Sequence, residues 1–496
     1  MFPYKTSISF DRKNKQSLYL QLSKQIIDLI KENRLPPQTK LPSSRNLSEL
    51  LGVHRKTIVA CYEELLLQGW IETIPKKGTF VHHSLPELQQ QNYFNAVKSI
   101  SKEKVGFQYY KNKSLRKKPT KPLDNYMSIN DGVSDGRLTP INEIARIYRR
   151  ITSRKEAYTH LSYGSTFGNE KLRDVLAEYL NETRGLHISK DNILITRGSQ
   201  NGIYLTSQLL LKENDTVIVG VTNYIAADIT FQNQKANLLR VQVDENGLDT
   251  CQIENICKKQ QIKAVYVTSH HHHPTTVTLS AERRIHLLNL AKKYRFAIIE
   301  DDYDYDFNYN HSPILPLASH DTNGNVIYIG SVCKTVAPVF RIGYLIASKE
   351  FVNEAANLRR IVDRQGDALL ELTFAEFIKN GDLDRHIKKI LKVYKTRRDL
   401  ICTLLKDELS EYFEFEIPKG GMAIWLKLHK DISWDLVSEI AFKNKLIIGD
   451  WTRYDPQDTK HNAIRLGFAT YNEEEIYDLI DKFKRILFTV TQKKSL

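Results

Sequence analysis

The sequence lacks the long apolar runs and clustered cysteines that mark whole classes of protein. No stretch approaches the ~18–20 uninterrupted apolar residues of a membrane-spanning helix, so no membrane partner is expected. Residues 1–15 contain no apolar run followed by small residues, so no signal peptide is predicted. The five cysteines are odd in number and scattered, and no Cys or His pair completes a metal-ligand spacing. A reducing cytoplasm is therefore the expected location.

The length and the charge distribution indicate several domains with different partners. A chain of 496 residues predicts two or three domains, and its apolar fraction of 41% allows sizeable cores. The net charge is +14. Residues 1–83 contribute +6 (13 Lys and Arg against 7 Asp and Glu), and residues 84–125 contribute another +6 (9 against 3), which leaves +2 for the rest. This asymmetry indicates that the first quarter faces a polyanion, although a solvated basic surface would look the same.

The first quarter contains the pattern of a helix-turn-helix. Apolar residues at helical spacing predict a helix over Leu18–Ile30. A short helix over Arg45–Leu51 follows, and Gly52 supplies the positive φ that a tight turn between helices needs. A third helix over His54–Leu66 is polar and basic at its start and apolar later. A recognition helix needs this polarity, because its first turn reaches the bases while the rest packs on the domain.

Two strands complete this region, over Gly69–Ile74 and Gly78–Val81, with Pro75–Lys77 as the basic tip of a wing. The runs Leu41–Arg45 (LPSSR) and Leu50–Thr57 (LLGVHRKT) closely resemble the winged helix-turn-helix domains of the GntR family. The resemblance implies binding to a double-stranded DNA operator. Arginine suits guanine edges, and lysine or hydroxyl groups suit phosphates. The residues that would contact DNA are Ser44, Arg45, Arg55, Lys56, Thr57 and Lys77.

The sequence predicts three segments. Residues 1–83 form the DNA-binding domain, residues 84–125 form a basic linker, and residues 126–496 form a second, larger domain. The linker is poor in apolar periodicity and contains the basic, proline-bearing run Arg116–Pro122. Its charge either reaches DNA phosphates or is simply solvated.

Strand-like and helix-like segments alternate from Met127 onward. This alternation predicts an α/β fold whose mostly parallel sheet has helices on both faces. Ligands of such sheets collect at the carboxyl ends of the strands. The clearest strands are Asn192–Thr196, Thr216–Gly220, Lys263–Thr268, Phe296–Glu300, Val326–Ile329 and Ile342–Ala347.

Several residues at these strand ends have the chemistry of a cofactor site. Lys334 lies three residues after Ser331 and seven before Arg341, and both neighbours are placed to meet a phosphate. An acid at the end of the Phe296–Glu300 strand can hold a protonated pyridine nitrogen, and Tyr303 can bond a ring hydroxyl. Residues 198–200 (GSQ) open a helix, whose amino end suits a phosphate.

In this order, these motifs strongly resemble fold-type I pyridoxal 5'-phosphate (PLP) enzymes, and specifically the aminotransferase-like domain of MocR-type regulators. The likeness covers roughly residues 127–490. It implies that Lys334 binds PLP covalently, that Asp301 pairs with the pyridine nitrogen and Tyr303 with the ring hydroxyl, and that Arg465 grips an effector carboxylate. It implies that Tyr224 stacks on the ring and that Tyr163 reaches in from a second subunit. The phosphate would lie among Ser199, Gln200, Ser331 and Arg341.

The sequence departs from the family near the expected cofactor face. The family usually has an acid and a proline ahead of the stacking tyrosine, where this chain has Gly220–Asn223. Its His-Gln-aromatic-Pro-Thr-Gly run is replaced by His271–Thr276 (HHHPTT), and Cys333 stands where serine is usual. These changes bear on the effector and on catalysis. A metal at His270–His273 is not expected, since adjacent residues at a strand end point in opposite directions.

The sequence predicts a homodimeric, PLP-dependent, DNA-binding transcriptional regulator that senses PLP or a small amino compound. One alternative is an active aminotransferase with an appended DNA-binding domain, since Lys334, Asp301, Tyr303 and Arg465 are all present. Another is a DNA-binding protein whose large domain merely dimerises.

Overall fold

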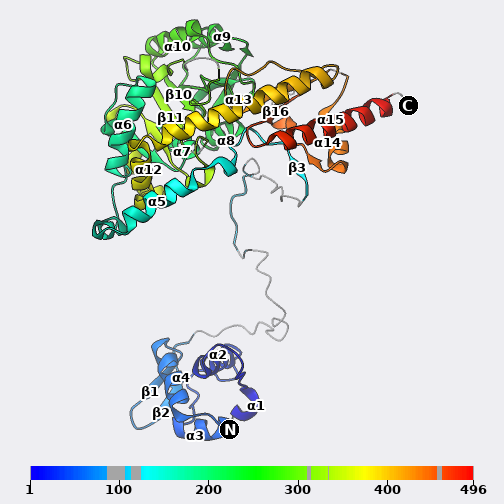
Figure 1. The fold of residues 1–496 in the computed structure, drawn as a ribbon. Helices are drawn as coiled ribbons and strands as arrows, with labels where there is room; N and C mark the ends of the chain where they lie inside the picture. Colours follow the sequence, from blue (N-terminus) through cyan, green and yellow to red (C-terminus); the bar gives the residue numbers. More distant parts are fainter. Residues whose placement is uncertain are drawn as a thin grey trace. The chain divides into compact units, whose positions relative to one another are not determined.

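The computed structural model describes residues 2–85, 105, 107–112, 115, 125–309, 314–332, 334–429, 431–454 and 461–494. Cys333 and the run Arg116–Pro122 lie outside these residues. The chain divides into two compact units, Met1–Lys111 and Asn112–Leu496 (Figure 1). In the described residues, no helix has both the length and the apolarity needed to cross a bilayer.

The N-terminal unit is a helical bundle with a β-hairpin. Its helices bury one apolar core, which includes Leu22, Ile26, Leu47 and Ile58. The elements are α1 (Tyr4–Ser7), α2 (Leu18–Lys31), α3 (Ser44–Leu51), α4 (Arg55–Leu67), β1 (Ile71–Ile74) and β2 (Gly78–Val81). The predicted helices and strands are thus present, with boundaries that shift by one or two residues.

Local sequence signals set the boundaries of the helix-turn-helix. The Ser43 hydroxyl caps α3 by accepting a hydrogen bond from the Asn46 amide, at 3.2 Å. Gly52 ends α3 with φ at 62°, the left-handed conformation that the turn requires. His54 caps α4 through its Nδ1 atom, which accepts from the Lys56 amide at 3.1 Å. The turn therefore presents the first residues of α4 to solvent.

A seven-stranded sheet organises the C-terminal unit. Its strand order is β4-β12-β11-β10-β9-β5-β6. β12 is antiparallel to both of its neighbours, and the other paired strands run parallel. The prediction of a mostly parallel sheet is confirmed. The strands are β4 (Ile193–Thr196), β5 (Thr216–Gly220), β6 (Asn237–Val241), β9 (Ala264–Val267), β10 (Ala297–Asp302), β11 (Val326–Ser331) and β12 (Gly343–Ile346).

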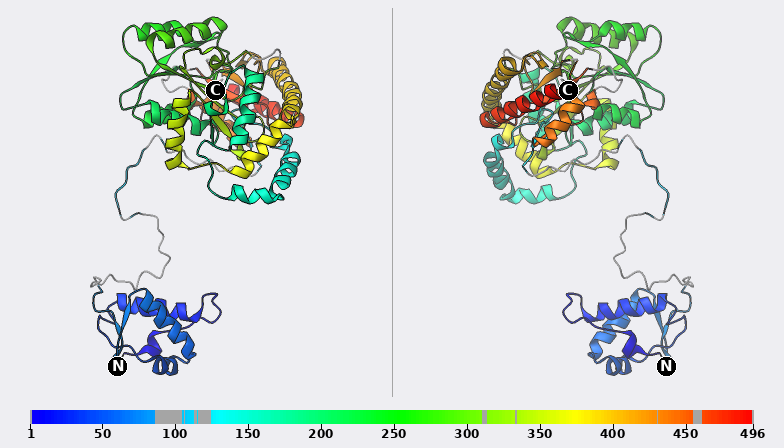
Figure 2. Two further views of the ribbon diagram at one scale, coloured as in Figure 1. Left: turned by 90° about the vertical axis from the view of Figure 1, so that its left-hand side faces the viewer. Right: turned by 90° about the vertical axis from the view of Figure 1, so that its right-hand side faces the viewer.

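Helices cover both faces of this sheet (Figures 1 and 2). Alternate residues of each strand enter different cores, as in β5, where Val217 and Val219 join one core and Ile218 another. One face packs on α7 (Ser199–Leu210), α8 (Ile225–Asn233) and α11 (Lys349–Val362). The opposite face packs on α6 (Glu170–Arg184), α9 (Thr250–Cys257), α10 (Ala281–Tyr294) and α12 (Ala368–Lys379), and α5 (Ile141–Thr152) packs beside α12.

The C-terminal part of this unit has a smaller sheet and its own core. The three antiparallel strands are β13 (Phe413–Glu414), β14 (Ala423–Leu428) and β16 (Ala463–Gly467). They pack with α14 (Trp434–Lys443) and α15 (Glu473–Lys494). The long helix α13 (Asp382–Leu409) contributes side chains to this core and to the core under the large sheet. Two short pairs complete the unit: β3 (Met127–Ser128) with β15 (Leu446–Ile447), and β7 (Val243–Asp244) with β8 (Gly247–Leu248).

The start of β12 must come very close to the start of α7. A Cβ atom on Gly343 would lie 2.7 Å from the backbone of Gly198 and 2.9 Å from the Thr196 hydroxyl. Backbone cannot yield as a flexible side chain can. We therefore expect Gly343→Ala to lower the free energy of unfolding by about 1–3 kcal/mol. Gly136→Ala is the control, because nothing lies within 4 Å of its Cβ position. Urea unfolding compares the two, and equal stability would contradict this packing.

Candidate cofactor site and nucleic-acid interface

A buried carboxylate lies at the carboxyl end of β10. Asp301 is 3% exposed, and its Oδ2 atom accepts a hydrogen bond from the Tyr266 hydroxyl at 2.7 Å. Its Oδ1 atom is also buried and has no hydrogen-bond donor among the described residues. Burial raises the pKa of Asp301 to about 7, and the charges of Asp302 and Asp304 act in the same direction. The site therefore holds an acceptor that lacks a donor, which suits a protonated ring nitrogen.

Lys334 and Tyr303 lie beside this carboxylate. The Lys334 charge lowers the pKa of Asp301, against the raising effect of burial. The Lys334 ammonium lies 6.0 Å from the centre of the Tyr303 ring, and it donates a hydrogen bond to the Gly132 carbonyl. The Tyr303 hydroxyl donates to the His271 carbonyl at 3.0 Å and accepts from Arg465 at 3.2 Å. The structure thus brings together Lys334, Tyr303 and Arg465, which lie far apart in the sequence.

Tyr224 borders the same space from the start of α8. Its ring meets the His273 ring edge-on, with 5.3 Å between centroids. The His273 ring also lies 6.4 Å from the Tyr303 ring and 6.1 Å from the Tyr454 ring. Burial raises the pKa of Tyr224 to about 12, so its hydroxyl stays protonated at neutral pH. Aromatic rings therefore surround this site, and of these sequence reasoning found Tyr224 and Tyr303 but not Tyr266 or Tyr454.

The amino end of α7 forms a cationic cradle with Arg341. Gly198 precedes α7 with φ at 78°, and the Arg341 guanidinium lies only 3.1 Å from where a Gly198 Cβ would be. Arg341 also donates to the Arg197 carbonyl at 2.7 Å. Backbone N–H groups and a guanidinium at a helix start are the donors that a phosphate prefers. Ser199, the first residue of α7, lies in this cradle.

Two of the predicted phosphate ligands have other partners in the structure. The Gln200 amide donates to the Thr230 hydroxyl at 2.9 Å, which directs it toward α8. The Ser331 hydroxyl donates to the Ile342 carbonyl at 3.1 Å. Their roles at a phosphate stay predictions.

Tyr163 is 76% exposed and stacks under the Arg364 guanidinium at 4.2 Å. It therefore points to solvent within one chain, and its reach into a second subunit stays a prediction.

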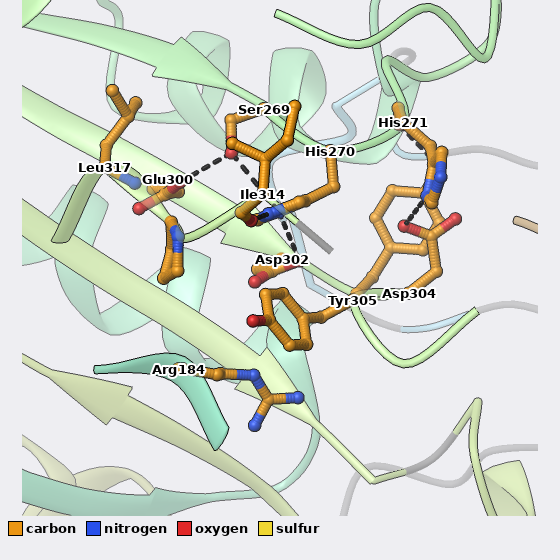
Figure 3. A network of polar contacts seen from close by, with 12 residues as sticks. Arg184, Ser269, His270, His271, Glu300, Asp302, Asp304, Tyr305, Ile314 and Leu317 are labelled. Atoms are coloured by element: carbon orange, nitrogen blue, oxygen red, sulfur yellow. Dashed lines mark hydrogen bonds and ion pairs between the residues drawn. The ribbon is translucent and has the colours of Figure 1, made fainter. Parts of the chain in front are cut away.

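The histidine run forms separate pairs instead of one cluster (Figure 3). His270 pairs with Asp302 at 3.1 Å, and His271 pairs with Asp304 at 2.9 Å. His272 contacts the Thr222 carbonyl at 2.9 Å. Each imidazole has its own partner, as the alternation of directions predicts for adjacent residues. These pairs hold the loop after β9 against the end of β10.

Glu300, on the opposite face of β10 from Asp301, is part of the same support (Figure 3). It accepts hydrogen bonds from the Ser269 hydroxyl at 2.5 Å and the Leu317 amide at 2.8 Å. Asp302 accepts from the Tyr328 hydroxyl at 2.5 Å. Of the acids on this strand, Asp301 alone keeps a buried oxygen that has neither a hydrogen bond nor an ion pair among the described residues, since Asp302 Oδ1 has the His270 ion pair. This arrangement singles out Asp301 for a ligand.

The predicted DNA contacts of the N-terminal unit lie at the starts of α3 and α4 and between β1 and β2. Arg45, Arg55, Lys56 and Lys77 are exposed. The Arg55 Nε atom donates to the Ser44 hydroxyl at 3.4 Å, which places the starts of α3 and α4 side by side.

Among the described residues, the group with metal-ligand spacing is Glu72, His82 and His83. An ion pair of 2.9 Å between Glu72 and His83, and stacking of the His82 and His83 rings, account for this arrangement.

The comparisons with known proteins agree with both units. Residues 127–483 match the model of the aminotransferase class I and II family, and residues 18–81 match that of the GntR family of bacterial regulatory proteins. The chain therefore belongs to the aminotransferase class I and II family. Its GntR-type helix-turn-helix in front of that domain is the organisation of MocR-type regulators. An aminotransferase fold of this class implies dependence on PLP.

Curated relatives share the whole arrangement. The HTH-type transcriptional regulator YdfD of Bacillus subtilis is 27% identical over 458 residues, which are 91% of this chain and 93% of that protein. The HTH-type transcriptional regulator NorG of Staphylococcus aureus (strain USA300) is 28% identical over 440 residues, 88% of this chain and 97% of that protein. The crystal structure of the multiple substrate aminotransferase of Thermococcus profundus has a TM-score of 0.69 at 28% identity. It covers 74% of this chain and 94% of its own.

The raised pKa of Asp301 predicts a pH-dependent stability of the cofactor-free protein. In the unfolded chain an aspartate titrates near 3.8, and in the fold Asp301 titrates at about 7. Between these values Asp301 carries a proton in the folded state but not in the unfolded state, so its contribution to stability is complete below pH ~4 and is lost as the pH rises to ~7. Asp301→Asn should remove this loss, about 1.4 kcal/mol for each pKa unit. Urea unfolding at several pH values tests it, and parallel pH profiles for both proteins would contradict it.

The start of α4 predicts a loss of DNA affinity when its basic residues are removed. An arginine that reads a base contributes about 1–3 kcal/mol to the free energy of DNA binding, and a lysine that contacts a phosphate adds a contribution that depends on the salt concentration. Arg55→Ala/Lys56→Ala should therefore weaken binding to a duplex that the parent selects from a random pool. Arg12→Ala/Lys13→Ala removes the same two charges outside the helix-turn-helix and should have a smaller effect. If the Arg55/Lys56 variant and the parent bound the duplex with equal affinity at matched salt, the start of α4 would be ruled out as a DNA-contacting surface.

Proposed function

We propose that the protein is a transcriptional regulator whose N-terminal unit binds operator DNA and whose C-terminal unit binds PLP and responds to it or to an amino compound. Two observations support the proposal together. Curated transcriptional regulators match through both units, over 91% and 88% of the chain. The C-terminal unit keeps a buried carboxylate with an unpartnered oxygen beside a lysine.

The residues around the pocket suit the parts of PLP. Asp301 would hold the ring nitrogen, Tyr303 the ring hydroxyl and Tyr224 the ring face. The cradle of Arg341 and Ser199 would hold the phosphate, with Gln200 and Ser331 beside it, and Tyr163 of a second subunit would complete it in a homodimer. Lys334 would supply the amine for the covalent link. When bound, PLP supplies an electron-withdrawing ring and an aldehyde that reacts with amines.

The residues of the chain then have separate tasks. The carboxylate of Asp301 keeps a positive charge on whatever ring nitrogen faces it, because a buried anion without a cationic partner is costly. Lys334 is held by the Gly132 carbonyl, and its amine must lose a proton before it attacks an aldehyde. Arg465 offers a buried guanidinium to the carboxylate of an effector. An amino acid is therefore the class of effector that this set of groups favours.

An active aminotransferase is the second candidate function. The observation in its favour is that four catalytic-type groups lie near one another: the Lys334 charge acts on Asp301, and Tyr303 contacts both the Lys334 ammonium and Arg465. Steady turnover of an amino donor with a keto acid would establish this activity. A regulator that only binds its effector would show a spectral change with each amine but no multiple turnovers.

The site predicts that PLP attaches to Lys334. Borohydride reduction of the PLP-treated protein, followed by peptide mass spectrometry, should place a pyridoxyl group on Lys334. Lys334→Ala should lose it. Lys427→Ala, which removes an exposed lysine of the same unit, should keep it. A pyridoxyl group found only on another lysine would contradict the assignment of this pocket as the PLP site.

A further inference from the structure

A carboxylate of the protein itself lies in the place where the pocket would receive an acid. Asp131 follows the short strand β3 by three residues. Its side chain contacts the Arg453 guanidinium at 3.3 Å and His273 Nε2 at 3.3 Å, and it accepts a hydrogen bond from the Tyr454 hydroxyl. The Arg465 Nε atom lies 4.0 Å away. Two guanidiniums and two further polar groups thus converge on one carboxylate.

The surroundings keep this carboxylate ionised. Burial opposes ionisation, but the neighbouring His273, Arg453 and Arg465 outweigh it and hold the pKa of Asp131 well below its usual range. Around Asp131, two guanidiniums thus face one negative charge. A ligand carboxylate that approached Arg465 would meet the negative charge of Asp131 first, and like charges at such distances repel strongly.

The partners of Asp131 differ in their freedom to move. The Arg465 side chain is 1% exposed and donates to three oxygens, those of Pro274, Tyr303 and the Asp131 backbone, at 2.9, 3.2 and 3.1 Å. The Asp131 side chain is 31% exposed. Arg465 is therefore fixed, whereas the Asp131 carboxylate has a route to solvent. An incoming acid can take its place without moving the guanidinium.

We propose that Asp131 is a built-in counter-ion that occupies the carboxylate position at Arg465 and Arg453, so that an acidic effector binds by displacing it. The proposal rests on the proposed function of this pocket as an effector site. A competing internal anion lowers the apparent affinity for every acid, which sets a higher concentration at which the pocket fills.

The position of Asp131 also links the acid site to the lysine. Gly132, the next residue, provides the carbonyl that accepts the hydrogen bond from Lys334. The Asn130 side chain accepts from the Gly132 and Val133 amides, both at 3.0 Å, so these residues form one tight turn. An acid that displaces Asp131 therefore acts on the turn that holds the Lys334 amine.

The test is calorimetric titration of cofactor-free full-length protein with succinate, a dicarboxylate that has no amine. Asp131→Asn keeps the size of the side chain and removes its charge. It should bind succinate at least about tenfold more tightly than the parent, because the competing charge is gone. Asp191→Asn removes a charge that pairs with Lys349 on an exposed surface, and it should bind as the parent does. Succinamide, which carries no charge, should not distinguish the variants.

Equal or weaker succinate binding by Asp131→Asn would overturn the proposal, and so would absence of binding by this variant. Asp131→Ala serves as the second variant if Asp131→Asn does not fold, with the same expected gain. The titration needs no PLP, so its failure is distinct from a failure of the cofactor assignment. If Asp131→Asn binds succinate more tightly but the protein forms no pyridoxyl group on Lys334, the counter-ion role of Asp131 is supported and the assignment of the PLP site is contradicted.

Discussion

The buried carboxylate of Asp301 is the constraint on which the cofactor pocket depends. The parallel arrangement of β9, β10 and β11 brings their carboxyl ends to one edge, and Asp301 enters the interior there beside Tyr266. A carboxylate in this position is costly unless a cation or donor faces it. The neighbouring acids Asp302 and Asp304 each pair with a histidine, His270 and His271 respectively. Among the acids of β10, the fold thus keeps the Oδ1 atom of Asp301 for a ligand.

The second constraint is charge balance at Arg465. This guanidinium is buried, and its hydrogen bonds to backbone oxygens and Tyr303 fix it, while Asp131 supplies a nearby negative charge. Because Arg465 is fixed and Asp131 can move, Asp131 would set the affinity of the pocket for acids. A pocket of this kind separates two tasks. Asp301 and Arg341 would retain a cofactor, and Arg465 with Asp131 would set the response to an effector.

Much of this arrangement could be predicted from the sequence, because it depends on local signals. The six predicted strands are all present, since each is a short and mostly apolar run. Gly52 predicted the turn because glycine adopts a positive φ at little cost, and its φ is 62°. The antiparallel direction of β12 was not predictable, because a strand's direction depends on its partners. The edge strand β6 is half-exposed and gives a weak apolar signal. Asp131, Tyr266 and Tyr454 carry no motif, and only the tertiary fold brings them to Arg465 and Asp301. The side-chain direction of Gln200 likewise depends on α8, which approaches α7 only in the fold.

The central claim is that one chain couples a DNA reader to a PLP pocket. The most direct measurement is the affinity of the full-length protein for a duplex selected from a random-sequence pool, with and without saturating PLP and at one salt concentration. The account predicts that PLP changes the affinity of the parent and leaves that of Lys334→Ala unchanged. The same affinity for the parent with and without PLP, under conditions in which Lys334 carries the cofactor, would contradict it.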